Sequence, residues 1–192
     1  MKIIFFLLII LVAFFEYSCK EKKVENSLGF NIDNSLLKSE FVDSLAGINL
    51  RAPLGWDDLS NDKNKKLKYR LNLYFKKGAD IKAFYIDTVN QACLIVSNLN
   101  LLTDRDIKHI FNNPDSSYNL DKKWEQIMKS EYILNGLDVT QFLLQNAQII
   151  NFKLILRNGD NKIYQVDYLS GREMYLKNVK KIESSIGTIN LK

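Results

Sequence analysis

An apolar segment at the N-terminus stands apart from the mixed pattern of the remaining chain. Met1 and Lys2 supply positive charge, and an unbroken run of 13 apolar residues extends from Ile3 to Phe15. A membrane-spanning helix needs about 20 apolar residues. The hydrophobic region of a secretory signal peptide is shorter and follows a positively charged N-terminus. We therefore predict a signal peptide over residues 1–18.

After this segment the pattern becomes polar, and regular hydrophobic periodicity begins only near residue 47. Residues 19–46 show no strong helical or strand period, which is typical of a tether or a loosely docked segment. A flexible coil of that length has an r.m.s. reach of about 30 Å. Residues 47–192 form the predicted globular domain, and its roughly 145 residues are enough to build a core without a metal or disulfide.

The first half of this domain alternates between strand and helix periods. Residues 48–52 alternate between apolar and polar side chains, which predicts a half-buried strand, and Trp56 follows at the predicted edge of the core. Residues 81–88 and 92–99 are apolar on both faces, as expected for central strands covered on both sides. Two helices are predicted, one capped by Ser60 (apolar face Leu67, Leu71, Tyr74 and Phe75) and one beginning at Thr103 (apolar face Ile107, Ile110 and Phe111).

Two dipeptides in the second half of the domain are typical of hairpin turns. These are Asn135-Gly136 and Asn158-Gly159. The strand that leads into the second turn has apolar side chains on one face and polar side chains on the other, and the returning strand alternates in the same way. The apolar positions are Ile150, Phe152, Leu154, Leu156, Tyr164, Val166 and Tyr168, and the polar positions are Asn151, Lys153, Arg157, Gln165 and Asp167.

Helical spacing recurs at two places in this half. Trp124, Ile127 and Met128 are spaced for one face of a short helix within residues 121–129. Near the C-terminus, Ser170 and Glu173 have the spacing of a capping box. They would begin a final helix that ends at Gly187 and whose apolar stripe is Tyr175, Val179, Ile182 and Ile186. The sequence thus predicts an α+β fold, a central antiparallel sheet of about five to seven strands with helices packed on its faces.

Three segments resemble a known fold family. The strand ending in "APLGW" (52–56), the turn "LNGL" (134–137) and the final helix "YLKNVKKIESSIGTI" (175–189) are similar to the PsbP-like fold. That fold is named for an extrinsic subunit of photosystem II and is shared with a Ran-binding nuclear import factor and many bacterial lipoproteins. The resemblance implies a PsbP-like α/β/α sandwich over roughly residues 48–191, and it carries no binding residue over to this chain.

The residues around Cys19 resemble the lipid-attachment signal of bacterial lipoproteins. A small residue, Ser18, precedes the cysteine, and charge follows from Lys20. Glu16 and Tyr17 depart from the usual pattern of an aliphatic and a small residue. The resemblance implies a diacylglycerol on the Cys19 sulfur and cleavage that leaves Cys19 as the new N-terminus. Because Lys20 differs from the Asp of inner-membrane retention, it also implies the outer membrane. An uncleaved N-terminal anchor and plain secretion are the alternatives.

The charge of the chain does not indicate nucleic-acid binding. Its formal net charge is +5, but 22 of its 27 basic residues are Lys. Recognition of bases and phosphates favours the guanidinium fork of Arg. The Arg residues are scattered along the chain, at Arg51, Arg70, Arg105, Arg157 and Arg172. We therefore expect no nucleic-acid partner.

Candidate catalytic groups are few. His109 is the only histidine, so any relay or zinc site that uses histidine would be built on it, and its polar neighbourhood favours a solvated surface position. Cys93 lies in an apolar strand, where a buried structural thiol is expected, although a disulfide to Cys19 is an alternative. No glycine-rich phosphate loop occurs.

Carboxylates occur close together at two places, Asp57 with Asp58 and Asp104 with Asp106. The first pair precedes a predicted helix and the second falls in a first helical turn, where negative charge is favoured for local reasons. Neither pair has the alternating oxygen ligands of a calcium loop. We therefore expect no metal and no cofactor.

These observations favour a non-catalytic protein of the bacterial cell envelope. We expect a lipoprotein that is attached to the membrane through Cys19 and that binds or scaffolds another envelope component, such as a protein partner. Two alternatives remain open. One is an envelope enzyme with a carboxylate-based site around Asp57 and Asp58, and the other is a carrier that holds a small ligand in a cleft between sheet and helix.

Overall fold

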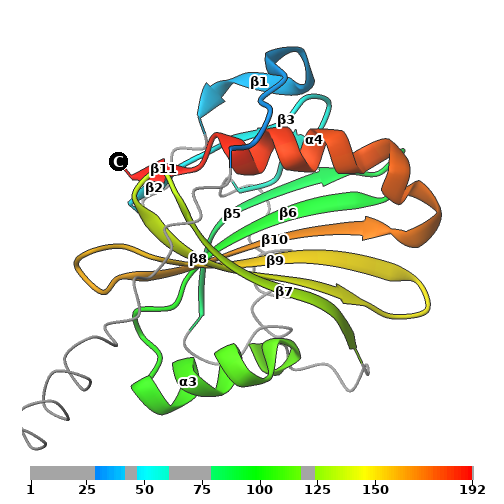
Figure 1. Ribbon diagram of the computed structural model, residues 1–192. Helices are drawn as coiled ribbons and strands as arrows, with labels where there is room; N and C mark the ends of the chain where they lie inside the picture. Colours follow the sequence, from blue (N-terminus) through cyan, green and yellow to red (C-terminus); the bar gives the residue numbers. More distant parts are fainter. Residues whose placement is uncertain (1–28, 42–46, 61–78, 118–123, 192) are drawn as a thin grey trace, which may run out of the picture.

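The fold is built around one seven-stranded antiparallel sheet (Figure 1). A computed structural model of the protein describes residues 29–41, 47–60, 79–117 and 124–191. Cys19 and the helix predicted after Ser60 lie outside these residues. From edge to edge, the strands are β4 (Asp57–Asp58), β5 (Asp80–Asp87), β6 (Ala92–Asn98), β10 (Ile163–Gly171), β9 (Ile149–Arg157), β8 (Leu137–Gln145) and β7 (Glu125–Leu134).

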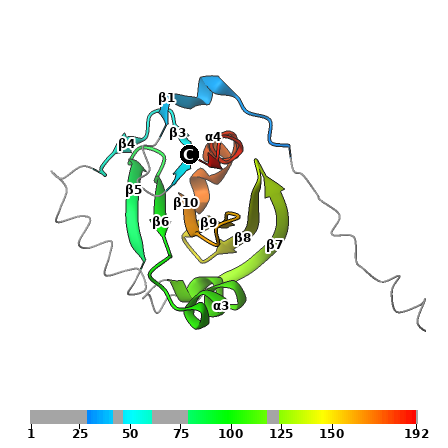
Figure 2. The same ribbon diagram turned by 90° about the vertical axis from the view of Figure 1, so that its left-hand side faces the viewer.

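Two helices lie on opposite sides of this sheet, as both views show (Figures 1 and 2). They are α4 (Tyr175–Gly187) and α3 (Asp104–Asn112). This arrangement confirms the predicted α+β class with an antiparallel sheet. None of the described helices is long and apolar enough to cross a membrane. The remaining elements are η1 (Asn34–Leu36), β1 (Leu37–Phe41) paired with β3 (Arg51–Pro53), β2 (Ile48–Asn49) paired with β11 (Asn190–Leu191), η3 (Pro114–Ser117) and η4 (Arg172–Met174).

The main core lies between the sheet and α4. Strand alternation sends Phe152, Leu154 and Leu156 of β9 into this core, where Ile182 and Ile186 of α4 complete it. The apolar face predicted for this strand is therefore confirmed. The other large members of the core include Trp56, Leu94, Val96, Tyr164, Val166 and Tyr168.

The opposite face of the sheet is buried as well. Ile110 of α3 packs with Phe142 and Ile155 of the sheet. A smaller cluster on the same face joins Phe84 of β5 to Ile95 of β6. The two-sided burial predicted for the strands at 81–88 and 92–99 is confirmed, because β5 and β6 contribute to clusters on both faces.

Residues 29–41, part of the segment predicted to be a tether or a loosely docked segment, are docked on the domain. The ring of Phe30 lies 6.0 Å from that of Tyr132, and β1 pairs with β3. Gly187 makes this docking possible, because a Cβ added there would lie 2.8 Å from Phe30 Cβ and from Ile32 Cγ1. Isolated apolar residues in a polar segment therefore dock on the C-terminal end of α4, a contact that periodicity does not predict.

The helix predicted within residues 121–129 is wrong, because Glu125 onward is strand β7. Asn135 and Gly136 have φ values of 49° and 82°, the positive pair that a type I′ turn requires, so that hairpin is confirmed. The turn places β7 beside β8, and the pairing extends as far as Glu125 opposite Gln145. Ladder hydrogen bonds thus override the helical spacing of Ile127, which is 48% exposed.

The predicted capping box at Ser170 does not form. Ser170 is the penultimate residue of β10, and the helical segment begins with η4, whose N-cap Gly171 supplies no side-chain hydrogen bond. The Ser170 hydroxyl instead accepts a hydrogen bond from Asn178 Nδ2 at 2.9 Å. The same amide nitrogen donates to the Asn90 carbonyl at 3.0 Å. Asn178 therefore joins α4 to β10 and to the β5–β6 turn.

Replacing Asn178 with alanine is expected to lower the free energy of unfolding by about 2 kcal/mol. The substitution removes both hydrogen bonds of a side chain that is 0% exposed, and it leaves the buried Ser170 hydroxyl without this donor. Urea unfolding of Asn178→Ala measures the change. Lys177→Ala, at an exposed position of the same helix, is the matched control, and an equal loss in both variants would contradict the assigned role.

Candidate functional site

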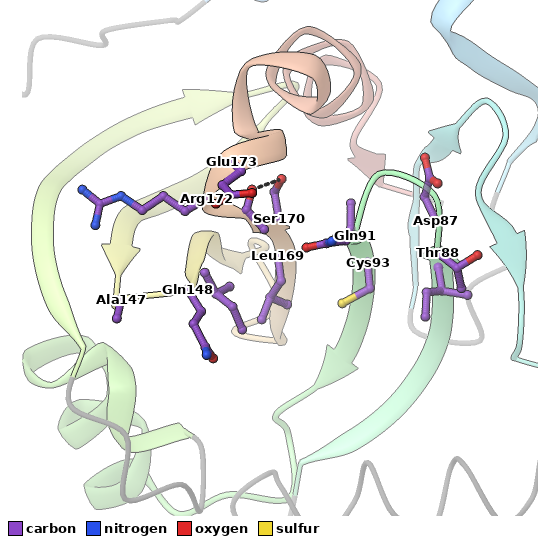
Figure 3. A pocket seen from close by; sticks show the side chains of 14 residues that line it. Asp87, Thr88, Gln91, Cys93, Ala147, Gln148, Leu169, Ser170, Arg172 and Glu173 are labelled. Atoms are coloured by element: carbon purple, nitrogen blue, oxygen red, sulfur yellow. Dashed lines mark hydrogen bonds between the residues drawn. The ribbon is translucent and has the colours of Figure 1, made fainter.

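A pocket of about 670 Å³ opens at one end of the sheet (Figure 3). Three segments meet there: the β5–β6 turn, the β8–β9 loop and the end of β10 where it enters η4. Gly171 donates its backbone N–H to the Gln91 carbonyl at 2.8 Å, and Arg172 donates to the Gln148 carbonyl at 2.9 Å, so backbone hydrogen bonds hold the segments together. The lining residues are Ile86, Asp87, Thr88, Gln91, Ala92, Cys93, Ala147, Gln148, Ile149, Leu169, Ser170, Gly171, Arg172 and Glu173.

The inner part of the pocket is apolar and its rim is polar. Cys93 and Leu169 are opposite each other on neighbouring strands, and Figure 3 shows the Cys93 sulfur directed toward the hollow. Gln91, Gln148 and Arg172 line the opening as exposed side chains. Pockets that bind small molecules combine an apolar lining with a few polar groups that orient the ligand. This pocket has that composition.

Two titratable groups that line the pocket, Cys93 and Asp87, have shifted pKa values. Desolvation by the surrounding protein, followed by the charge of Asp167, raises the pKa of the Cys93 thiol to about 12. A protonated thiol is a poor nucleophile. Burial alone would raise the pKa of Asp87, but hydrogen bonds from Asn90 and Val89 hold it below the ordinary value. Asp87 is thus an ionised acceptor that fixes the β5–β6 turn.

A buried ion pair lies beside the pocket, two residues before Leu169 on β10. Lys153 of β9 and Asp167 of β10 are directly opposite each other, and Lys153 Nζ lies 3.2 Å from Asp167 Oδ1 with both side chains 0% exposed. Asn151 donates to Asp167 Oδ1 at 3.1 Å, and Gln165 donates to Asp167 Oδ2 at 2.6 Å. Burial lowers the pKa of Lys153, and the Asp167 charge opposes this shift.

Two buried polar atoms beside the ion pair have no hydrogen-bond partner among the described residues. They are Ser97 Oγ and Gln165 Oε1, and their residues are opposite each other on β6 and β10. Asp167 also precedes Leu169 by two positions, so it lies on the same face of β10 as the wall of the pocket. The ion pair and its amides therefore form a polar layer next to the apolar inner part of the pocket.

The candidate residues from the sequence do not gather in this site, apart from Cys93. His109 is exposed in the last turn of α3, with Nδ1 2.9 Å from Asn113 Nδ2. Asp57 and Asp58 form β4 and are exposed, and Asp58 accepts a hydrogen bond from the Ser60 N–H at 2.7 Å. Hence the two carboxylates suggested for an enzyme site lie at the sheet edge, outside the pocket.

The second carboxylate pair has a local structural role. Thr103 is the N-cap of α3, and its hydroxyl accepts from the Asp106 N–H at 3.2 Å and donates to Asp106 Oδ2 at 2.7 Å. Asp104 and Asp106 both lie in the first turn of the helix, as predicted. Within the described part of the chain, no group of three or more His, Cys, Asp or Glu side chains could hold a metal ion.

Sequence reasoning missed the buried ion pair, although it identified the polar positions on both strands. The sequence indicated a hairpin near Asn158-Gly159, but the loop that joins β9 to β10 runs from Asn158 to Lys162, and this longer loop sets the pairing of Lys153 with Asp167. A two-residue turn at Asn158-Gly159 would place Lys153 opposite Tyr164 instead. Opposite charges at directly paired positions indicate contact. Both side chains are completely buried because other segments cover the face of the sheet opposite α4. No local pattern in β9 or β10 predicts this.

No protein-family model matches this chain, and no curated protein shows significant similarity to it.

Proposed function

We propose that this protein is a non-catalytic lipoprotein of the bacterial cell envelope whose folded domain binds another envelope component in the pocket described above. The observation that carries this proposal is the pocket itself. Its volume of about 670 Å³ falls within the range of roughly 300 to 1,000 Å³ typical of small-molecule sites. The protonated Cys93 thiol and the hydrogen-bonded Asp87 carboxylate favour binding over acid–base or nucleophilic catalysis.

The size of the pocket favours a small molecule as the bound component. The neighbouring Gln91 and Gln148 amides offer both donors and acceptors, and Cys93 and Leu169 offer apolar contact. A ligand with one polar end and one apolar end fits this division. The PsbP-like fold belongs to the same proposal, and the antiparallel sheet between α4 and α3 supports it at the level of fold class.

Native mass spectrometry of the full chain, purified from its own membranes in mild detergent, tests the binding proposal. The unmodified protein is expected to retain a noncovalent small-molecule mass. Leu169→Trp places a larger side chain at the pocket wall and is expected to lose that mass, whereas Leu176→Trp, at a position 82% exposed on α4, is expected to keep it. A pocket-filled variant that folds and still carries the mass, or a wild-type protein without one, argues against the proposal.

The lipid anchor is tested at Cys19. If acyl chains are attached there, each buried CH₂ contributes about 0.8 kcal/mol, and two or three chains make attachment effectively permanent. Cys19→Ser is expected to abolish palmitate labelling, while Cys93→Ser, at the other cysteine of the chain, is the control and keeps the label. Intact mass measurement should place the mature N-terminus at Cys19 with added acyl mass. An intact Met1 or an unmodified Cys19 thiol would exclude the anchor.

A further inference from the structure

A second groove lies between α3 and the β9–β10 hairpin. Its volume is about 830 Å³. The groove meets β10 at its first residue, Ile163, whereas the pocket lies at the other end of that strand, from Leu169 onward. α3 itself is on the side of the sheet opposite α4 (Figures 1 and 2). The groove and the pocket are therefore separate sites.

The floor of the groove is apolar. Leu102 and Ile163 are buried in the cluster beneath α3, and Ile107 and Phe111 of the helix pack against the same cluster while remaining partly exposed. Partly exposed apolar side chains at the bottom of a groove offer contact area to a ligand that has an apolar body. An inorganic ion would leave this floor in contact with water.

The rim of the groove is positively charged. Lys108 comes from α3, Arg157 from the end of β9 and Lys162 from the loop before β10. Asp104 is the single carboxylate among the described lining residues. None of the three cations forms an ion pair with a carboxylate within the described chain. Among the lining residues the cations thus outnumber the acids, and outside the lining Asp138 of β8 is directly opposite Arg157 without an ion pair between them. The net charge of the rim favours an anion.

The fold holds the Arg157 side chain and orders the loop that carries Lys162. The Arg157 guanidinium lies 5.6 Å from the centre of the Phe111 ring, a cation–π contact that fixes the side chain over the groove. Asn158 Oδ1 accepts hydrogen bonds from the backbone N–H groups of Asp160 at 3.0 Å and Lys162 at 2.9 Å. The loop that carries Lys162 is therefore ordered before any ligand arrives, which lowers the entropic cost of binding.

We propose that this groove binds an organic phosphate with an apolar body. The phosphate group contacts Lys108, Arg157 and Lys162, and the apolar body lies on Ile107 and Phe111. A phosphate monoester carries up to two negative charges near neutral pH, which matches a rim where cations exceed acids. The same monoester occurs in a soluble organic phosphate and in the headgroup of phosphatidic acid, an anionic phospholipid.

Isothermal titration calorimetry of the full chain with hexyl phosphate tests this site. Hexanol keeps only the apolar chain and inorganic phosphate keeps only the charged group, so each is expected to bind at least about tenfold more weakly than hexyl phosphate. Arg157→Gln is expected to weaken hexyl phosphate binding about tenfold, since it removes a charge-assisted hydrogen bond. Lys177→Gln, an exposed cation on the far helix α4, is the matched control and should leave the affinity unchanged.

Dihexanoyl phosphatidic acid, a short-chain lipid whose phosphate is a monoester like that of hexyl phosphate, distinguishes the two sources of phosphate. Tighter binding than hexyl phosphate supports a lipid headgroup as the ligand, and weaker binding supports a soluble organic phosphate. Lys162→Gln provides a second cation variant, and thermal melting verifies that each variant folds. Hexyl phosphate affinity that is unchanged in both Arg157→Gln and Lys162→Gln, or equal to that of inorganic phosphate, would overturn the proposal.

Discussion

Asp167→Asn is expected to lower the free energy of unfolding by about 3 to 5 kcal/mol, because it leaves the buried Lys153 ammonium without a countercharge. Both side chains are 0% exposed, and they are 3.2 Å apart. The substitution also weakens the acceptor that Asn151 and Gln165 share. Chemical unfolding at neutral pH measures the loss. Asp160→Asn, at an exposed position in the adjoining loop, is the matched control and is expected to be nearly neutral.

The double variant Lys153→Met with Asp167→Asn separates the charge from the packing. Removal of both charges leaves no unpaired ion, so this variant should recover much of the stability lost in Asp167→Asn.

The pH dependence of stability gives a further check. Because burial lowers the pKa of Lys153 below 10.5, the unfolded chain binds more protons just below that pH, and stability rises with pH there. Asp167→Asn should steepen this rise, and a double variant no more stable than the single one would contradict the mechanism.

Phe152→Ala is also expected to cost about 3 to 5 kcal/mol, through lost burial and the cavity left behind. The side chain is 6% exposed and belongs to the core between the sheet and α4. Its ring stacks on that of Tyr175, with centroids 5.9 Å apart and an interplanar angle of 14°. Phe152 therefore joins β9 to the first turn of α4. Thermal and urea unfolding measure the effect.

Two comparisons make this prediction specific. Phe152→Leu retains most of the apolar volume and should cost clearly less than alanine. Leu176→Ala, next to Tyr175 but 82% exposed, should leave stability almost unchanged because little apolar area is lost. A loss below about 1 kcal/mol for Phe152→Ala would show that this ring does not form part of a packed core.

The hairpin turns show why local chemistry is readable from sequence. Asn135 and Gly136 tolerate positive φ, and that property belongs to the residues themselves. The turn they form is therefore predictable without knowledge of distant residues. The second hairpin forms with a different turn, because its loop runs from Asn158 to Lys162 and the positive φ falls on Asn161. The Asn158 side chain stabilises this loop by accepting hydrogen bonds from residues two and four positions ahead.

Strand β7 shows the limit of such signals. Ile127 and Met128 have helical spacing with Trp124, but a short segment has too little intrinsic helix stability to resist pairing with a neighbouring strand. Once the Asn135-Gly136 turn forms, β8 offers its hydrogen-bonding edge to the residues before the turn. The segment adopts the strand conformation for a reason that lies outside it. The Ser170 hydroxyl, which serves Asn178 in place of a helix cap, is a similar case.

The sequence by itself determined the α+β class, the apolar faces of strands such as β9 and the Asn135-Gly136 turn, because each depends on periodicity or on the conformational preferences of neighbouring residues. Only the tertiary structure decided the rest. The pocket combines segments around Gln91, Gln148 and Arg172 that meet only when β6, β9 and β10 are adjacent. The sequence shows that Lys153 and Asp167 are charged, but it does not show that they are buried. They are buried because other parts of the chain cover that face of the sheet. A site of this kind depends on contacts between distant segments, which local patterns do not encode.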